Sequence, residues 1–347
     1  MSDRLRVDVG GLWLANPIIA GSGEHMIEAA GVSAALAAGS GAAVVKSANE
    51  NPSAARQLGH TDYAMFDSSW RRLAWDESPP SDASLFNRSG LQPLGLDRWI
   101  EQTATLIADN EAPVLPSVIP GDLDSLPGLV QRIAAETECA GFELNIGAPH
   151  GAEAADGALS LERDEKRIGE IVAAVRGVLD VPLWVKITGQ SDGVPQMASA
   201  AFSAGADAVT LITRHMAMLP DLETQSPTMG TVVAYGGGWA LPITCRWLAL
   251  TRQLVGPDKT LIGTHGARTG GDVARMLLAG ATAVQMTSAV FTGGYRTLAD
   301  AVVELDAYLE SRGQTAADIV GRAADRLTGY TDQPFDADAW RRFIPDT

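Results

Sequence analysis

Cysteine is scarce in this chain: it has two, Cys139 and Cys245, among 347 residues. Both stand in apolar or helical contexts, so they offer no zinc-binding spacing and cannot ligate an iron–sulfur cluster by themselves. No metal site is expected. Because so little cysteine is typical of proteins kept in a reducing compartment, we expect a cytoplasmic protein.

Long apolar runs are also missing. No stretch of about 18 uninterrupted apolar residues could span a bilayer, so a membrane partner is not expected. The opening residues, MSDRLRVDVGG, lack the apolar segment of a secretory signal.

Positive charge is in short supply, with 26 basic against 42 acidic residues and a net charge of −16. Because nucleic acids are bound through concentrated Lys and Arg, this balance argues against a nucleic-acid partner. The hydrophobic fraction of 46% is ordinary for a globular protein with a large core.

Short apolar runs alternate with helical patterns along the chain. This alternation predicts an α/β protein, and about eight units predict a closed (β/α)8 TIM barrel. We expect one barrel domain over residues 1–331 and a tail over residues 332–347. Strands are predicted at Ile18–Gly21, Ala43–Lys46, Val114–Val118, Phe142–Ile146, Leu183–Ile187, Ala208–Thr213, Leu261–Thr264 and Ala283–Thr287.

Two long excursions interrupt the repeat, at residues 60–100 and 214–242. Long loops on a compact barrel often bind ligands, and these follow strands at the carboxyl-terminal face. They are predicted to cover the mouth of a site there, although a peripheral subdomain or a contact within a homodimer is the alternative.

Polar residues gather where the predicted strands end, which is where barrel enzymes bind their substrates. Lys46 and Lys186 follow apolar strands and indicate fixed positive charge awaiting an anion, or else lysines that reach the solvent. The last two units carry glycine and hydroxyl residues that favour a phosphate site, although ordinary helix capping uses the same residues. Four of the five histidines also fall on this rim, namely His25, His150, His215 and His265.

In order and spacing, several motifs resemble the dihydroorotate dehydrogenase superfamily of barrels that bind flavin mononucleotide (FMN), closest to its pyrimidine-dehydrogenase branch. The resemblance runs from about Leu12 to Gly313. The motifs are "NPIIAGSG" at the first strand, "VKS" at the second, "NRSGLQPLG" at 87–95, "ELNIGAPHG" at 143–151, "VKI" at 185–187, "GADAVTLIT" at 205–213 and "LLAGATAVQMTSAV" at 277–290.

The resemblance implies roles for individual residues. Those implied to contact FMN are Ala20, Gly21, Ser22, Lys46, Ser47, Asn145, Lys186, Gly237, Gly238, His265, Gly266, Thr287 and Ser288. Those implied to contact the substrate are Asn87, Asn145, Thr213 and Arg214.

The chain departs from the family pattern at the catalytic loop. There the family carries a Cys or Ser base before a proline, where this chain has Ala148, and Gly147 replaces a serine. Thr213 stands where an asparagine is expected, and Arg214 replaces a small hydroxyl residue. The loop at 236–242 is shorter than the family's and contains Trp239. His150 is the first candidate for a relocated acid–base group, with Lys46 as a second catalytic residue.

The resemblance therefore predicts an FMN-dependent oxidoreductase that moves a hydride between flavin N5 and a small cyclic or conjugated substrate. The departures from the family pattern predict a substrate that differs from dihydroorotate. The partners of the enzyme would be that small molecule and a separate electron acceptor or donor. A flavin-binding protein without turnover, a tRNA dihydrouridine synthase-like enzyme and a metal-dependent hydrolase are the alternatives.

Overall fold

A computed structural model describes residues 2–51, 56–75, 79–148 and 163–345 of the chain. Its main element is a parallel sheet in the order β8-β4-β3-β16-β15-β12-β11-β10-β9. β8 and β9 are two halves of one expected strand, divided at Pro116, and they pair with β4 and β10 respectively. The sheet therefore curls round on itself as a TIM barrel does. Its strands are β3 (Ile18–Ala20), β4 (Ala42–Val44), β8 (Val114–Leu115), β9 (Ser117–Val118), β10 (Phe142–Asn145), β11 (Leu183–Lys186), β12 (Ala208–Leu211), β15 (Thr260–Thr264) and β16 (Ala283–Met286).

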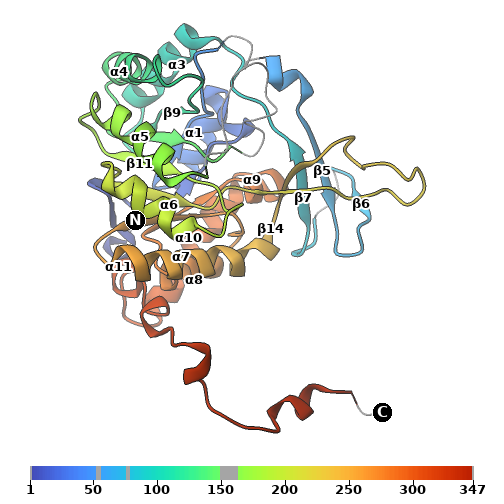
Figure 1. The fold of residues 1–347 in the computed structure, drawn as a ribbon. Helices are drawn as coiled ribbons and strands as arrows, with labels where there is room; N and C mark the ends of the chain where they lie inside the picture. The colour runs from blue at the N-terminus through green and yellow to red at the C-terminus, as the bar shows by residue number, and fades with distance from the viewer. Residues whose placement is uncertain (1, 52–55, 76–78, 149–162, 346–347) are drawn as a thin grey trace.

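Helices follow these strands and pack outside the barrel (Figure 1). They form where apolar residues recur on one helical face, and the strands they cover are buried on both sides. All eight predicted strands are present within one or two residues of their expected ends. The helices are α1 (Ala29–Ala37), α3 (Leu96–Asp109), α4 (Leu126–Thr137), α5 (Glu165–Arg176), α6 (Val194–Ser203), α7 (Leu241–Val255), α8 (Gly270–Leu278), α9 (Ser288–Gly293), α10 (Arg296–Glu310) and α11 (Ala316–Ile319).

The two predicted excursions build a second sheet. Both were expected as loops, but they pair with each other in the antiparallel order β13-β14-β7-β5-β6. Figure 1 shows this sheet projecting from one side of the barrel. Apolar side chains cover both of its faces, which is why it is stable outside the barrel core. Its strands are β5 (Asp62–Phe66), β6 (Arg72–Leu73), β7 (Ser84–Arg88), β13 (His215–Ala217) and β14 (Val233–Gly237).

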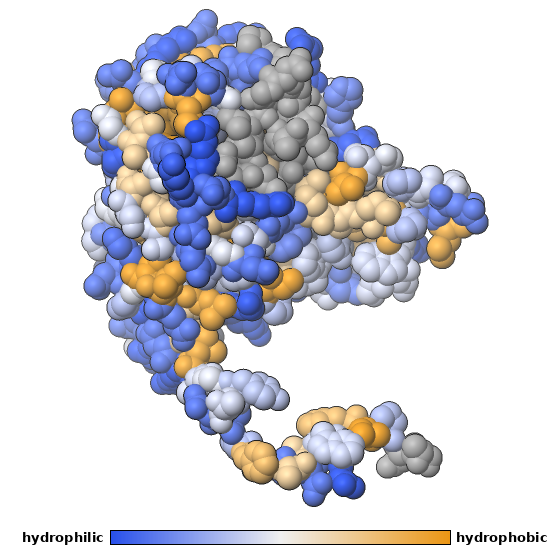
Figure 2. Space-filling view, viewed as in Figure 1, coloured by the Kyte–Doolittle hydropathy of each residue, from blue (hydrophilic) through white to orange (hydrophobic). Residues whose placement is uncertain are grey.

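The two ends of the chain differ in how they pack. A hairpin of β1 (Val7–Val9) and β2 (Leu12–Leu14) packs at the start of β11, where the Trp184 indole donates to the carbonyl of Val9 over 3.1 Å. Beyond Leu327 the chain is largely exposed and leaves the body as an arm (Figures 1 and 2). The division between a barrel domain and a tail stays a prediction. Across the described ranges, no helix combines the length and apolarity needed to cross a membrane.

Candidate active site

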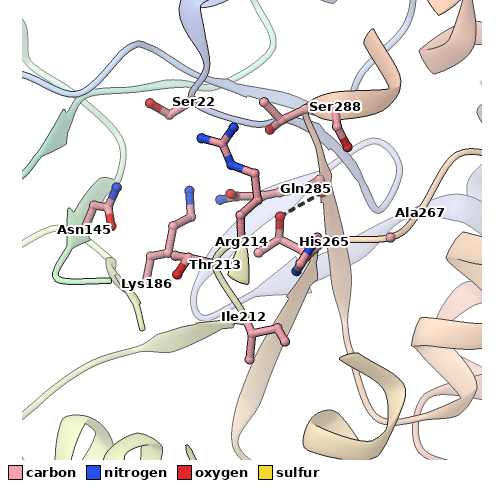
Figure 3. Close-up of a pocket in the computed structure, with 13 residues that line it drawn as sticks. Ser22, Asn145, Lys186, Ile212, Thr213, Arg214, His265, Ala267, Gln285 and Ser288 are labelled. Carbon is pink, nitrogen blue, oxygen red and sulfur yellow. Dashed lines mark hydrogen bonds between the residues drawn. The ribbon is translucent and has the colours of Figure 1, made fainter. Parts of the chain in front are cut away.

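A pocket opens at the carboxyl ends of the barrel strands, with about 620 Å³ of unfilled space. Asn145 and Lys186 lie on one side of it, Ser288 and Ala267 lie on the opposite side, and Arg214 reaches between them (Figure 3). Its lining consists of Ser22, Asn145, Lys186, Ile212, Thr213, Arg214, Thr264, His265, Gly266, Ala267, Gln285, Thr287 and Ser288.

Lys186, the last residue of β11, is balanced by a carboxylate inside the barrel. Its ammonium lies 3.0 Å from both oxygens of Glu143, which is completely buried. Glu143 also accepts hydrogen bonds from Ser117 over 2.9 Å and from Gln285 over 2.7 Å. A buried ion pair is tolerated only when its remaining hydrogen-bonding capacity is satisfied in this way. Lys186 is therefore held rigidly at the pocket wall.

Lys46, just beyond β4, has its own buried partner. Its ammonium lies 3.2 Å from Glu24 at the end of β3, and both side chains are nearly inaccessible to solvent. Glu24 also accepts hydrogen bonds from the Tyr63 hydroxyl and, over 3.1 Å, from the Gly90 amide. Burial alone would raise the pKa of the Glu24 carboxyl, but Lys46, Tyr63 and Arg214 together lower it to about 2. Glu24 is therefore ionised at neutral pH.

A row of hydroxyl groups runs from Ser22 at the pocket wall to Glu143. Ser22 lies 3.2 Å from Ser47, and Ser47 lies 2.9 Å from Ser117, which donates to Glu143. Ser47 also donates its amide to the Ser22 hydroxyl over 3.1 Å. Ser47 is thereby placed behind Ser22, one layer away from the pocket surface.

Arg214 follows β12 and crosses the mouth of the pocket. Its guanidinium donates a hydrogen bond to the side-chain oxygen of Asn87 in β7. Among the described residues, no carboxylate lies within 4.0 Å of this guanidinium. Arg214 thus differs from Lys46 and Lys186, which each have a carboxylate in contact.

The loop that follows β10 is fixed by short polar contacts. Asn145 accepts the Gly147 amide over 3.2 Å, and Thr213 donates to the Gly147 carbonyl over 2.6 Å. A Cβ on Gly147 would lie 2.6 Å from the backbone of Ile187, so this position has no room for a side chain. Ala148 packs against Leu91 and Ile119.

An aromatic group borders the pocket beside Arg214. Trp239 stacks on Tyr235 at 4.5 Å between ring centroids and meets the edge of His265 at 5.3 Å. Burial, with further contributions from His215 and Arg214, lowers the pKa of His265 to about 3. His265 is therefore a neutral imidazole, and neither of its ring nitrogens has a hydrogen-bond partner among the described residues.

The far end of the pocket is lined by backbone and hydroxyl groups. Gly266 has φ near +117°, and a Cβ there would lie 2.4 Å from the Leu241 amide nitrogen. Only glycine fits this turn, which brings the chain close to the pocket. Thr287 and Ser288 follow β16 and complete this end.

The structure brings together most residues that the sequence singled out. Those that line the pocket are Ser22, Asn145, Lys186, Thr213, Arg214, His265, Gly266, Thr287 and Ser288. Ala20 and Gly21 directly precede Ser22. Three further residues do not line the pocket, namely Lys46, Ser47 and Asn87. Ser47 and Asn87 form hydrogen bonds with the pocket residues Ser22 and Arg214, and Lys46 directly precedes Ser47. Gly237 ends β14 and Gly238 begins the turn before α7, and they pack against Trp239 and Arg268 respectively. His150 is outside the described residues.

Four functional candidates escaped sequence reasoning. They are Glu24, Tyr63, Glu143 and Gln285. Glu143 and Gln285 are polar residues inside apolar strands, a signal that the sequence did contain. The pairing of Glu24 with Lys46 depends on the adjacency of β3 and β4, which a strand list alone does not give.

The pocket suits FMN. The carbonyl oxygen of the Gln285 side chain and both nitrogens of His265 are buried without partners among the described residues, as expected where a polar ligand belongs. Ser22, Asn145 and Lys186 would hold a planar heterocycle, while Gly266, Thr287 and Ser288 would hold a phosphate.

Comparison with known proteins agrees with the family that the sequence motifs resemble. The sequence matches the dihydroorotate dehydrogenase family over residues 4–309. It is 30% identical over 287 residues to the catalytic subunit of dihydroorotate dehydrogenase B (NAD(+)) from Methanopyrus kandleri, covering 82% of this chain and 84% of that protein. The same subunit from Geotalea uraniireducens is 30% identical over 232 residues, 66% of this chain and 73% of that protein.

A third relative has a different type designation. A putative dihydroorotate dehydrogenase A (fumarate) from Solibacter usitatus is 30% identical over 245 residues, 70% of this chain and 78% of that protein. The relatives support the superfamily without favouring its pyrimidine-dehydrogenase branch. Fold, pocket and sequence agree, and this chain belongs to the dihydroorotate dehydrogenase family of FMN-dependent oxidoreductases.

Proposed function

We propose that the protein transfers a hydride between FMN and a small cyclic or conjugated substrate that carries an anionic group, and that Arg214 binds this group. The observation that carries the proposal is the charge distribution at the pocket. Lys46 and Lys186 each contact a buried carboxylate, whereas Arg214 has none within 4.0 Å among the described residues. Since both lysines are paired, Arg214 is the residue whose positive charge is available to attract a substrate.

The chemistry of Arg214 favours a carboxylate. A guanidinium presents two parallel N–H groups that match the two oxygens of a carboxylate. Arg214 is also oriented by its hydrogen bond to Asn87, so fewer side-chain conformations are lost when a ligand binds. Asn87, Asn145 and Thr213 are proposed to contact the remainder of the substrate. By binding a carboxylate in this way, Arg214 would favour anionic substrates over uncharged pyrimidines.

FMN would supply the hydride donor and acceptor at its N5 atom. The chain's own part is to bind and orient the reactants and to handle a proton. Ala148 cannot exchange a proton, and the Thr213 hydroxyl donates to the Gly147 carbonyl. His150 is the proposed acid–base group, two residues beyond Ala148, and Lys46 is the second catalytic residue. Electrons would pass to or from a separate acceptor or donor.

The test is ligand binding to the FMN-loaded protein, followed by perturbation of the flavin spectrum. Orotate is the anionic probe, and uracil is the same ring without the carboxylate. We expect orotate to bind and Arg214→Ser to weaken it about 10- to 150-fold, because a hydrogen bond to a charged group contributes about 1.5–3 kcal/mol.

Arg98→Ser removes an exposed arginine on α3 and is the matched control, for which no change is expected. If uracil bound as tightly as orotate, Arg214 would not select an anion. The same would follow if Arg214→Ser bound orotate with unchanged affinity.

A further inference from the structure

We infer that Glu24 is a positioning residue that fixes Lys46 behind the wall of the cofactor pocket and makes the bound FMN harder to reduce. The inference rests on the proposed placement of FMN in this pocket. It concerns a carboxylate for which no role was predicted.

Glu24 connects four separate segments. It belongs to the turn after β3, contacts Lys46 after β4, and accepts hydrogen bonds from Tyr63 in β5 and from Gly90 beyond β7. The last two come from or follow the projecting sheet, whose strand β7 also supplies Asn87 to Arg214. One carboxylate therefore links the barrel rim to the sheet beside the substrate region. With three partners on two oxygens, its position is well determined.

The environment keeps Glu24 charged and Lys46 paired. Burial lowers the pKa of Lys46, and the contact with Glu24 opposes that effect. Because the ionised Glu24 has neighbouring positive charge on both Lys46 and Arg214, its negative charge is retained inside the rim. Lys46 and Glu24 together contribute no net charge, unlike a lone lysine.

The pair adjoins the wall of the pocket. The amide of Ser47, the residue after Lys46, donates to the Ser22 hydroxyl, and Ser22 lines the pocket. Reduction of FMN places additional negative charge on its ring, so a nearby carboxylate disfavours the reduced form. At separations below about 10 Å in a partly buried site, removal of one charge is expected to change a binding ratio about tenfold.

Glu24→Gln tests this inference directly. The measured quantity is the ratio of the dissociation constants of oxidised and reduced FMN, obtained by titrating apoprotein with oxidised FMN and by measuring the potential of the bound cofactor. We expect the variant to favour reduced FMN about tenfold more than the natural protein does, which raises the two-electron potential by about 30 mV.

Three further variants separate charge from shape. Tyr63→Phe removes a hydrogen bond but leaves the Glu24 charge, so its ratio should change less than twofold. Glu24→Met also removes the charge, and it leaves no amide that needs hydrogen-bond partners. We expect the same tenfold change from it, so it can replace Glu24→Gln if that variant does not fold. A double variant, Glu24→Gln with Lys46→Met, should return towards the natural ratio because both charges are absent.

The inference would be overturned if Glu24→Gln and Glu24→Met both kept the ratio of dissociation constants within twofold of that of the natural protein. A change in favour of oxidised FMN would overturn it as well. An equal effect in Tyr63→Phe would show that structure rather than charge is responsible, and would overturn it as well. These measurements use no substrate, so they succeed or fail independently of the anion proposed for Arg214.

Discussion

The buried pair of Lys186 and Glu143 allows a prediction with a defined magnitude. Lys186→Met keeps most of the side-chain volume but removes the ammonium that lies 3.0 Å from both Glu143 oxygens. Glu143 would retain its bonds from Ser117 and Gln285, yet its charge would have no counterion inside the barrel. Removing one partner of a buried ion pair typically destabilises a protein by about 3–5 kcal/mol.

The assay is equilibrium unfolding of the apoprotein in urea, so that any effect on cofactor binding does not enter. The matched control is Lys166→Met, which breaks the exposed pair of Lys166 and Glu170 at 3.8 Å on α5. Exposed pairs contribute about 0–1 kcal/mol, so this control should be nearly as stable as the natural protein. A loss below about 1 kcal/mol in Lys186→Met, similar to the control, would refute the view that Glu143 depends on Lys186 for its charge balance.

Two other predictions follow from the site. The folded-state pKa of His265 is about 3, below the ordinary value of 6.5, so the unfolded chain binds more protons between these values and stability falls as the pH is lowered through this window. Between pH 7 and pH 4.5 the apoprotein should therefore lose about 3 kcal/mol more than His265→Asn does, and equal losses in urea unfolding would contradict a neutral, buried imidazole. Ala148→Cys restores a thiol at the family's base position but should not confer dihydrouracil oxidation, because an uncharged ring leaves Arg214 without its anion; measurable turnover would show that only the base was missing.

The barrel could be predicted from the sequence because its strands are local features. Each is a short apolar run that precedes a helical pattern, and burial on both faces keeps the run continuous. The projecting sheet could not be predicted in the same way. β7 pairs with β14 across about 150 residues of chain, and nothing local in either excursion specifies that partner. Both were therefore expected to be loops. Trp70, in the first of them, borders a groove with Phe66 and Leu219.

In the site, too, features within one strand could be predicted from the sequence, but contacts between strands could not. Lys46 and Lys186 could be identified because a lysine is conspicuous at the end of an apolar strand. Their partners were not identified, because Glu24 and Glu143 reach them only through the pairing of neighbouring strands. Without those partners, both lysines were expected to provide unbalanced positive charge. We propose that Arg214 takes this role instead.

A crystal structure of the FMN-loaded protein with orotate would show whether Arg214 binds the anion. We expect FMN between Lys186 and the Thr287–Ser288 end of the pocket, with the orotate carboxylate within hydrogen-bonding distance of the Arg214 guanidinium. A carboxylate bound elsewhere, with Arg214 directed away from the ligand, would contradict this expectation.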